Sequence, residues 1–198
     1  MIGCSPAARP VSILEVVRAL GTSADHDGTN LELKARVADL AAVRERIRVT
    51  GAERGGTERQ TDRYFAVPAG RLKLRESSAD GVHLIIYQRP EEGRFRPSRF
   101  HRLPVSAPGP LAGTLESMLG APVVVEKTRE IWWWRDVRIH LDDVAGQGTF
   151  LEFEARVDRI GDGVEAARRL TGLCQLLAIQ PADVVGRSYG EMPCGATI

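Results

Sequence analysis

The stretch N-L-E-L-K-A-R-V, residues 30–37, decides how the rest of the chain is interpreted. Side chains alternate between the two faces of a β-strand, so Glu32 and Lys34 share one face while the two leucines occupy the other. Residues two apart on a strand lie about 7 Å from each other, so one bound ligand can contact both charged groups. The stretch therefore predicts a strand with one charged face and one apolar face.

Four further stretches alternate in the same way. Residues 71–75 read R-L-K-L-R, and residues 137–142 read V-R-I-H-L-D. Residues 151–157 read L-E-F-E-A-R-V, and the β-branched and aromatic stretch 123–134 carries two cations two residues apart. A lone strand of this kind would turn its charges to water, but three of these strands are cationic and the last is acidic. This segregation indicates one shared site, formed by Glu32, Lys34, Arg71, Lys73, Arg75, Lys127, Arg129, Arg138, His140, Asp142, Glu152 and Glu154.

About eight strands, mostly antiparallel, are predicted in total. Eight antiparallel strands can close into a barrel, which removes exposed edges and can enclose one ligand. Helices would then cover the apolar outer faces and leave the charged faces in the lumen. We therefore expect an α+β fold, a closed eight-stranded antiparallel β-barrel with a polar lumen and flanking helices. The remaining strands are expected at 60–67, 82–89 and 99–105, after a loop at 51–57.

The 198-residue chain has room for one well-filled core. We expect a barrel domain over 30–190, preceded by an extension, 1–29, with a short helix at 11–20, and followed by a loose tail, 191–198. Capping residues or a proline mark the helix starts, at Asp39, Pro108 and Asp162.

The composition, with 43% hydrophobic and 27% charged residues, is that of a water-soluble globular protein. A net charge of +1 provides no overall field for nucleic acid or an anionic membrane, so we expect neither as a partner. The three cysteines lack metal-ligand spacing, and no membrane span or signal-peptide pattern is present in the sequence. We expect a cytoplasmic location with free thiols, and a homodimer is one option for the oligomeric state.

Lysine is rare in this chain, because arginine provides all but three of the 27 basic residues. A GC-rich genome would explain the excess of arginine. Each lysine, however, lies inside an alternating strand pattern, at positions 34, 73 and 127. This placement indicates a role in the shared site.

A lumen with many like charges requires a ligand, because an unpaired buried ion costs several kcal/mol. A polyphosphate carrying a divalent metal would supply anions to the cations and a cation to the carboxylates. Lysine and arginine side chains must hold the phosphates, because the sequence has no Gly-rich phosphate loop. The carboxylates form an all-oxygen set that suits Mg²⁺ or Mn²⁺ rather than zinc: Glu32, Asp142, Glu152 and Glu154.

Two features leave alternatives open. His140 is either a general base or a hydrogen-bonded lumen residue, and a metal-activated oxygen is the better candidate for the base. The adjacent tryptophans 132–134 point to opposite faces of a strand, so at most two of them line the lumen. We expect the tryptophans to pack mainly in the outer core.

Five motifs occur in a characteristic order between residue 30 and about residue 190. They are N-L-E-L-K-A-R-V, Q-T-D-R-Y-F-x-V-P-x-G-R-L-K-L-R-E, Y-Q-R-P, V-R-I-H-L-D-D-V-x-G-x-G-T-F-L-E-F-E and R-S-Y. In this order they resemble the CYTH family, the triphosphate tunnel metalloenzymes that include class IV adenylate cyclases and thiamine triphosphatases. The resemblance implies an eight-stranded tunnel that binds a triphosphate with a divalent metal.

The resemblance also implies roles for individual residues. The metal ligands would be Glu32, Glu152 and Glu154, together with Asp142. The phosphate contacts would be Lys34, Arg71, Lys73, Arg75, Arg89, Lys127, Arg129 and Arg138. Catalytic roles are expected for Lys34, Arg138 and Glu152. Asn30 departs from the E-x-E-x-K signature of the family and removes one negative charge, which leaves the number of metals open, although Asn here resembles a cyclase-like bacterial branch.

Three functions fit these residues. A cyclase would let the ribose 3′-hydroxyl of ATP attack the α-phosphorus, with pyrophosphate leaving. A hydrolase of an organic or inorganic triphosphate would use water at the terminal phosphorus. A polyphosphate or nucleotide binder without turnover would fit the charge lost at Asn30. The likeness of R-L-K-L-R-E and V-R-I-H-L-D to the cyclase-like branch favours the cyclase.

Overall fold

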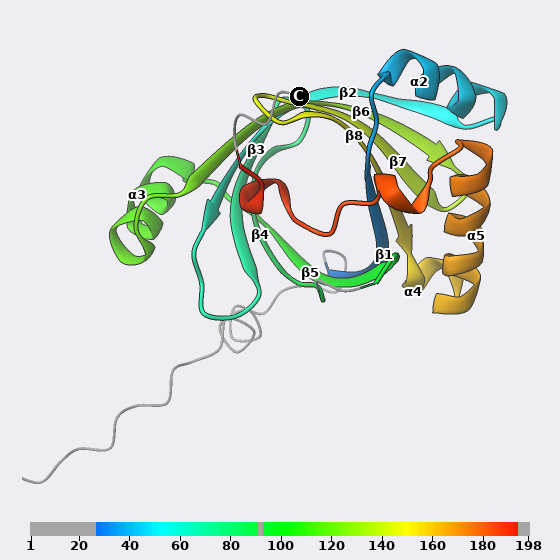
Figure 1. Ribbon diagram of the computed structural model, residues 1–198. Coiled ribbons are helices and arrows are strands. Elements are labelled where there is room, and N and C mark those ends of the chain that lie inside the picture. The colour runs from blue at the N-terminus through cyan, green and yellow to red at the C-terminus, as the bar shows by residue number, and fades with distance from the viewer. Residues whose placement is uncertain (1–26, 91–92, 194–198) are drawn as a thin grey trace, which may run out of the picture.

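Eight antiparallel strands close into a barrel in this computed structural model, which describes residues 27–90 and 93–193 (Figure 1). The order around the barrel is β1-β5-β4-β3-β2-β6-β7-β8, and β8 pairs back with β1. This confirms the predicted fold class. The predicted helix at 11–20 lies outside the described residues. The strands are β1 (Asp27–Arg36), β2 (Glu53–Phe65), β3 (Arg71–Ser77), β4 (Gly81–Gln88), β5 (Arg96–Pro104), β6 (Val123–Trp134), β7 (Val137–Val144) and β8 (Gly148–Arg156).

The two strands with the most similar sequences, β1 and β8, are neighbours in the barrel. Their antiparallel register places Glu32 opposite Glu154, and Lys34 opposite Glu152. Side chains directly opposite each other on one face are close enough to interact. The register therefore gathers three carboxylates and one ammonium on the inner face of a single strand pair.

Helices cover the outside of the barrel on two sides. Figure 1 shows α2 (Leu40–Val49), α4 (Val157–Ile160) and α5 (Gly163–Leu176) along one side, and α3 (Pro108–Leu119) on the other. Asp39 caps α2 and Asp162 caps α5, each accepting backbone N–H bonds as expected for an N-cap. No helix in the described part of the chain has the length and apolar character needed to cross a membrane.

The hydrophobic core lies between the barrel and these helices. Leu33 of β1, Ile139 of β7 and Phe153 of β8 are fully buried, together with Ile47 of α2 and Leu170 of α5. Burying one such side chain contributes about 1.5–3 kcal/mol. Since the apolar faces are satisfied on the outside, the charged faces of the same strands point into the lumen.

The sequence prediction was wrong at 51–57, where β2 already begins at Glu53. The strand carries a bulge between Arg54 and Gly56, so the apolar alternation that marks a strand is lost there. Gly55 suits the close approach to β6, because a Cβ at this position would lie 3.0 Å from the indole nitrogen of Trp133. The glycines at 55 and 56 predicted a loop, but this segment is a strand in close contact with β6.

Two other boundaries also differ from the prediction. Strand β5 begins at Arg96, three residues early, because its pairing with β1 continues as far as Arg96, opposite Glu32. The buried Arg96 side chain also donates a hydrogen bond to the carbonyl of Val185. Residues 189–191, expected near the start of a loose tail, form the 3-10 helix η3 (Tyr189–Glu191).

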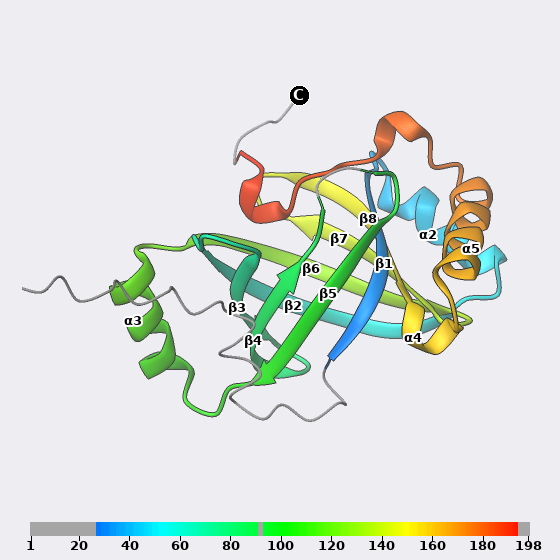
Figure 2. The same ribbon diagram turned by 90° about the horizontal axis from the view of Figure 1, so that it is seen from below.

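The C-terminal segment lies across one end of the barrel (Figures 1 and 2). After η2 (Pro181–Asp183), the Val185 amide donates to the Lys34 carbonyl, and the Gln147 side chain donates to the Tyr189 carbonyl. Tyr189 packs edge-on against Phe150, with ring centroids 5.1 Å apart. This segment therefore closes one end of the lumen with an aromatic side chain.

Candidate functional site

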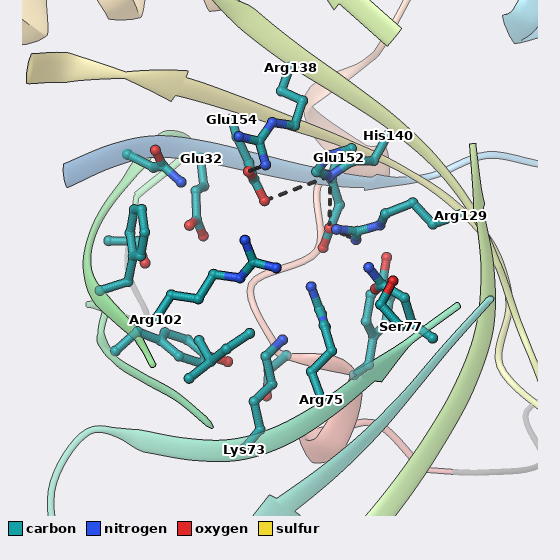
Figure 3. A pocket seen from close by; sticks show the side chains of 18 of the residues that line it. Glu32, Lys73, Arg75, Ser77, Arg102, Arg129, Arg138, His140, Glu152 and Glu154 are labelled. Carbon is teal, nitrogen blue, oxygen red and sulfur yellow. Dashed lines mark hydrogen bonds and ion pairs between the residues drawn. The ribbon is translucent and has the colours of Figure 1, made fainter. Parts of the chain in front are cut away.

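A cavity of about 390 Å³ occupies the lumen and is lined by side chains from all eight strands (Figure 3). The charged faces of the strands point inward, as the sequence predicted. Eleven of the predicted site residues contribute to its wall: Glu32, Lys34, Lys73, Arg75, Arg89, Lys127, Arg129, Arg138, His140, Glu152 and Glu154.

All three lysines of the chain face this cavity. Lys34, Lys73 and Lys127 are 3%, 9% and 5% exposed. The Lys34 ammonium lies 3.0 Å from a carboxylate oxygen of Glu152 and 3.3 Å from the ring centroid of Tyr189. A buried ammonium group needs such partners. The burial of all three lysines therefore indicates an anion-binding site rather than a solvated surface.

Asp62 of β2 is the anion that holds the cationic wall together, and the sequence analysis missed it. Its carboxylate is fully buried and accepts hydrogen bonds from Arg75 (2.6 Å) and Lys73 (3.1 Å), with Lys127 at 3.5 Å. Burial opposes ionisation, but these three cations hold the pKa of Asp62 well below its usual range. Arg75 and the two lysines are thus fixed in place before any ligand binds.

Asp142 has a similar place behind Arg129. The sequence predicted it as a metal ligand, but it is fully buried and is not part of the cavity wall. It accepts hydrogen bonds from Arg129 Nε (2.7 Å) and from the Tyr189 hydroxyl (2.8 Å). Its oxygens are therefore positioned to orient Arg129 toward the cavity.

Arg71 and Arg89 differ in their access to the cavity. Arg71 is not part of its wall and instead donates to Glu191 (2.9 Å) and to the Arg89 carbonyl (3.2 Å). Arg89 lines the cavity and donates to Glu32 (3.2 Å). The alternation placed Arg71 on the correct face of β3, but this residue lies at the end of the barrel that the C-terminal segment covers.

The carboxylates gather on the opposite wall, on β1 and β8, next to His140 of β7 (Figure 3). One ligand atom each from His140, Glu152 and Glu154 lies within 4.8 Å of the other two. Burial and then the charge of Glu154 raise the pKa of Glu32. Carboxylates that repel each other in a buried site suit a divalent cation, so the donor set fits a metal.

Two further groups support this acidic wall. Asn30 is 5% exposed, and its amide oxygen has no hydrogen-bond partner among residues 27–90 and 93–193. This oxygen is a free acceptor on the cavity wall, beside Glu32. Burial and then Arg129 lower the pKa of His140, which favours a neutral imidazole.

Two of the three tryptophans pack outside the lumen, as predicted. Trp132 is buried in the outer core and donates to Glu130 (2.9 Å), and Trp134 packs against the same core. Trp133 lies on the inner face of β6, where the Arg138 guanidinium is 4.9 Å from its ring centroid. The tryptophan therefore helps to orient Arg138 at the other end of the barrel.

Several residues of the wall were not singled out in the sequence. They are polar, aromatic or basic side chains from β2, β4, β5, β8 and the C-terminal segment, including Glu58, Gln60, Tyr64, Tyr87, Ser98, Phe100, Arg102, Arg156, Ser188 and Tyr189. Tyr64 and Tyr189 belong to the quoted motifs Q-T-D-R-Y and R-S-Y, which are the only sequence signal for them.

Comparison with known proteins supports this description. The CYTH domain pattern matches residues 28–189. A Methanocaldococcus jannaschii protein named "Putative adenylate cyclase" is 24% identical over 169 residues, which cover 82% of this chain and 97% of that protein. The solved structure of a Pyrococcus horikoshii OT3 protein has a TM-score of 0.70 and 23% identity, covering 82% of this chain and 98% of that one.

A second solved structure has the same fold. It is a Hippeastrum protein described as a "putative adenylyl cyclase" with a dominant triphosphatase activity. Its TM-score is 0.57 and its identity 15%, and the match covers 81% of this chain and 92% of that one. At this level of identity the likeness shows the barrel fold alone.

Proposed function

Because the chain belongs to the CYTH family, whose members are metal-dependent enzymes acting on triphosphates, we propose that it converts ATP to cyclic AMP and pyrophosphate in the lumen of the barrel. The proposal depends mainly on one observation, which is the sorting of charges across the cavity. Buried cations lie on β3 and β6, the two strands that flank β2, and a group of carboxylates lies on β1 and β8.

The charge of the cavity favours a metal-bearing polyanion. Among the described residues, nine cations line the wall: Lys34, Lys73, Arg75, Arg89, Arg102, Lys127, Arg129, Arg138 and Arg156. Five carboxylates line it with them: Glu32, Glu58, Asp80, Glu152 and Glu154. Asp62 and Asp142 add two more just behind the wall. The remaining excess is positive, and it is complementary to the negative charge that a triphosphate keeps after binding one divalent ion.

The cations would bind the phosphates and stabilise the charge that develops during the reaction. Arg75 and Arg129 are already held by Asp62 and Asp142, so they need little reorganisation when substrate arrives. In the cyclase reaction the ribose 3′-hydroxyl loses its proton to solvent as its oxygen forms a bond to the α-phosphorus, while the bond from this phosphorus to the bridging oxygen of the β-phosphate breaks. A divalent ion bound by Glu152 and Glu154 would add Lewis-acid stabilisation. The negative charge passes to pyrophosphate, and Arg75 and Arg129 on the cavity wall would stabilise it there.

Three apolar side chains in the wall favour an organic substrate over an inorganic one. Ile85, Phe100 and Ile131 are apolar residues in an otherwise charged lining. Aromatic and aliphatic side chains provide an apolar surface on which a nucleobase or sugar can pack, whereas an inorganic phosphate chain has no apolar group to pack there. A triphosphate hydrolase is the second candidate, supported by the triphosphatase activity of the Hippeastrum neighbour.

A product assay tests the proposal. The protein is incubated with ATP, GTP, thiamine triphosphate and tripolyphosphate, each with Mn²⁺ or Mg²⁺, and the products are separated by chromatography. Cyclic AMP with pyrophosphate is the expected result. Orthophosphate as the only product would replace the cyclase with the hydrolase. Stabilisation of about 2.7 kcal/mol at a hundredfold excess of triphosphate over Kd, without turnover, would leave only a binding function.

Triphosphate affinity is expected to fall as the pH rises above about 7. Burial and the charge of neighbouring arginines lower the pKa of Lys73 to about 7 and that of Lys127 to about 8. A bound triphosphate favours the charged lysines, so a lysine that is neutral in the free protein takes up a proton on binding. Below this range both lysines are already charged. Above it the affinity falls by up to about tenfold per pH unit for each lysine.

Calorimetry of tripolyphosphate binding in buffers of different ionisation enthalpy measures this proton uptake. The control is Lys73→Arg, which keeps its charge throughout this pH range. Since the ligand's own protonation is the same in both proteins, the difference between them reports Lys73. Equal proton uptake by the two proteins would contradict the prediction.

A further inference from the structure

His140 lies in the middle of the acidic wall, between the two carboxylates of β8. Its Nδ1 atom is 3.7 Å from Glu154 Oε1 and 3.9 Å from Glu152 Oε2, in the group shown in Figure 3. Both separations are too long for a hydrogen bond. They are the right length for three ligands around one ion, because metal–ligand bonds of about 2.0–2.6 Å place ligand atoms about 3–5 Å apart.

The Nδ1 atom of His140 is also without a hydrogen bond in the described part of the structure. The side chain is 1% exposed, and Nδ1 has no hydrogen-bond partner among the described residues. Leaving a buried polar atom unsatisfied costs about 1–3 kcal/mol. An imidazole that only orients a neighbour would lie within hydrogen-bond distance of it, whereas this nitrogen lies 3.7 Å and 3.9 Å from two carboxylates.

The two carboxylates differ in how free they are. Glu152 is held by Lys34 on one oxygen and by Arg129 on the other. Glu154 has Arg138 at 3.6 Å from its Oε2 and His140 at 3.7 Å from its Oε1, and neither of these described residues is within hydrogen-bond distance. The Oε1 atom of Glu154 and the Nδ1 atom of His140 are therefore both available as metal ligands, and they lie 3.7 Å apart.

We propose that His140 is a metal ligand together with Glu152 and Glu154, and that this nitrogen ligand makes the site select Mn²⁺ and related transition-metal ions over Mg²⁺. Mg²⁺ prefers oxygen ligands and water, while imidazole favours the transition metals. The inference rests on the proposed function only for the location of the site. It revises the all-oxygen ligand set expected from the sequence.

Binding of the metal alone to the intact chain tests the proposal. Calorimetric titrations with MnCl₂, CoCl₂ and MgCl₂ are compared for the wild type, His140→Gln and the control His101→Gln, whose residue lies on the outer face of β5. We expect the wild type to bind Mn²⁺ more tightly than Mg²⁺. His140→Gln should weaken Mn²⁺ and Co²⁺ by about tenfold or more and Mg²⁺ by much less. His101→Gln should change neither. Equal losses for Mn²⁺ and Mg²⁺, or no loss, would overturn the proposal.

A spectroscopic measurement keeps the test independent of the variant's folding. Electron spin-echo spectroscopy of the wild-type Mn²⁺ complex should detect one coupled imidazole nitrogen. A spectrum without nitrogen coupling overturns the proposal even if the protein makes cyclic AMP. Nitrogen coupling in a protein that turns over no triphosphate supports the metal site and rejects the proposed function, so the two failures are distinguishable.

Discussion

Asp62→Asn is expected to destabilise the ligand-free barrel by about 3–5 kcal/mol, the cost of removing one partner from a buried ion pair. The asparagine keeps the shape of the side chain but leaves Lys73, Arg75 and Lys127 without their shared anion. Urea unfolding of the two proteins measures the difference. The matched control is Asp143→Asn on the exposed face of β7, which should stay within about 0.5 kcal/mol of the wild type.

The same variant should respond more strongly to an anion. Tripolyphosphate would provide the three cations with a new partner, so it should stabilise Asp62→Asn more than it stabilises the wild type. This outcome separates a charge effect from simple misfolding, because a misfolded barrel would gain nothing from the ligand. A variant as stable as the wild type would show that Asp62 does not neutralise the cationic wall.

The inward direction of the charged faces could be predicted because it depends on local alternation combined with charge type. Lys34, Lys73 and Lys127 illustrate this. Each belongs to a strand in which charged and apolar residues alternate, and all three line the cavity. No single strand distinguishes a lumen from a solvated face. The distinction came from the segregation of cations and carboxylates among five strands, which a solvated surface does not require.

The partners of these residues could not be predicted, because they depend on strand register and on contacts between distant parts of the chain. Asp62 lies opposite Arg75 only through the pairing of β2 with β3. Tyr189 reaches Lys34 and Asp142 only because the C-terminal segment crosses the end of the barrel. The same segment carries Glu191, which accepts a hydrogen bond from Arg71 outside the cavity wall. Alternation assigns a face, but it carries no information about position along the lumen.

Replacing Glu152 with glutamine is expected to lower kcat by about a hundred- to a thousandfold while the barrel stays folded. Glu152 contacts Lys34 at 3.0 Å and also accepts a hydrogen bond from Arg129, so its charge fixes two cations that face the substrate. It also belongs to the candidate metal group. Loss of one preorganised charged group that acts in the transition state has an effect of this size.

The fold of the Glu152→Gln variant should survive because its neighbours keep other partners. Arg129 still pairs with Asp142 at 2.7 Å, and Lys34 still lies over the Tyr189 ring. Glu126→Gln, on the exposed face of β6, is the matched control and should keep full activity. Thermal unfolding is measured beside the product assay. A variant that retains wild-type turnover would show that the carboxylate charge at position 152 does not support the reaction.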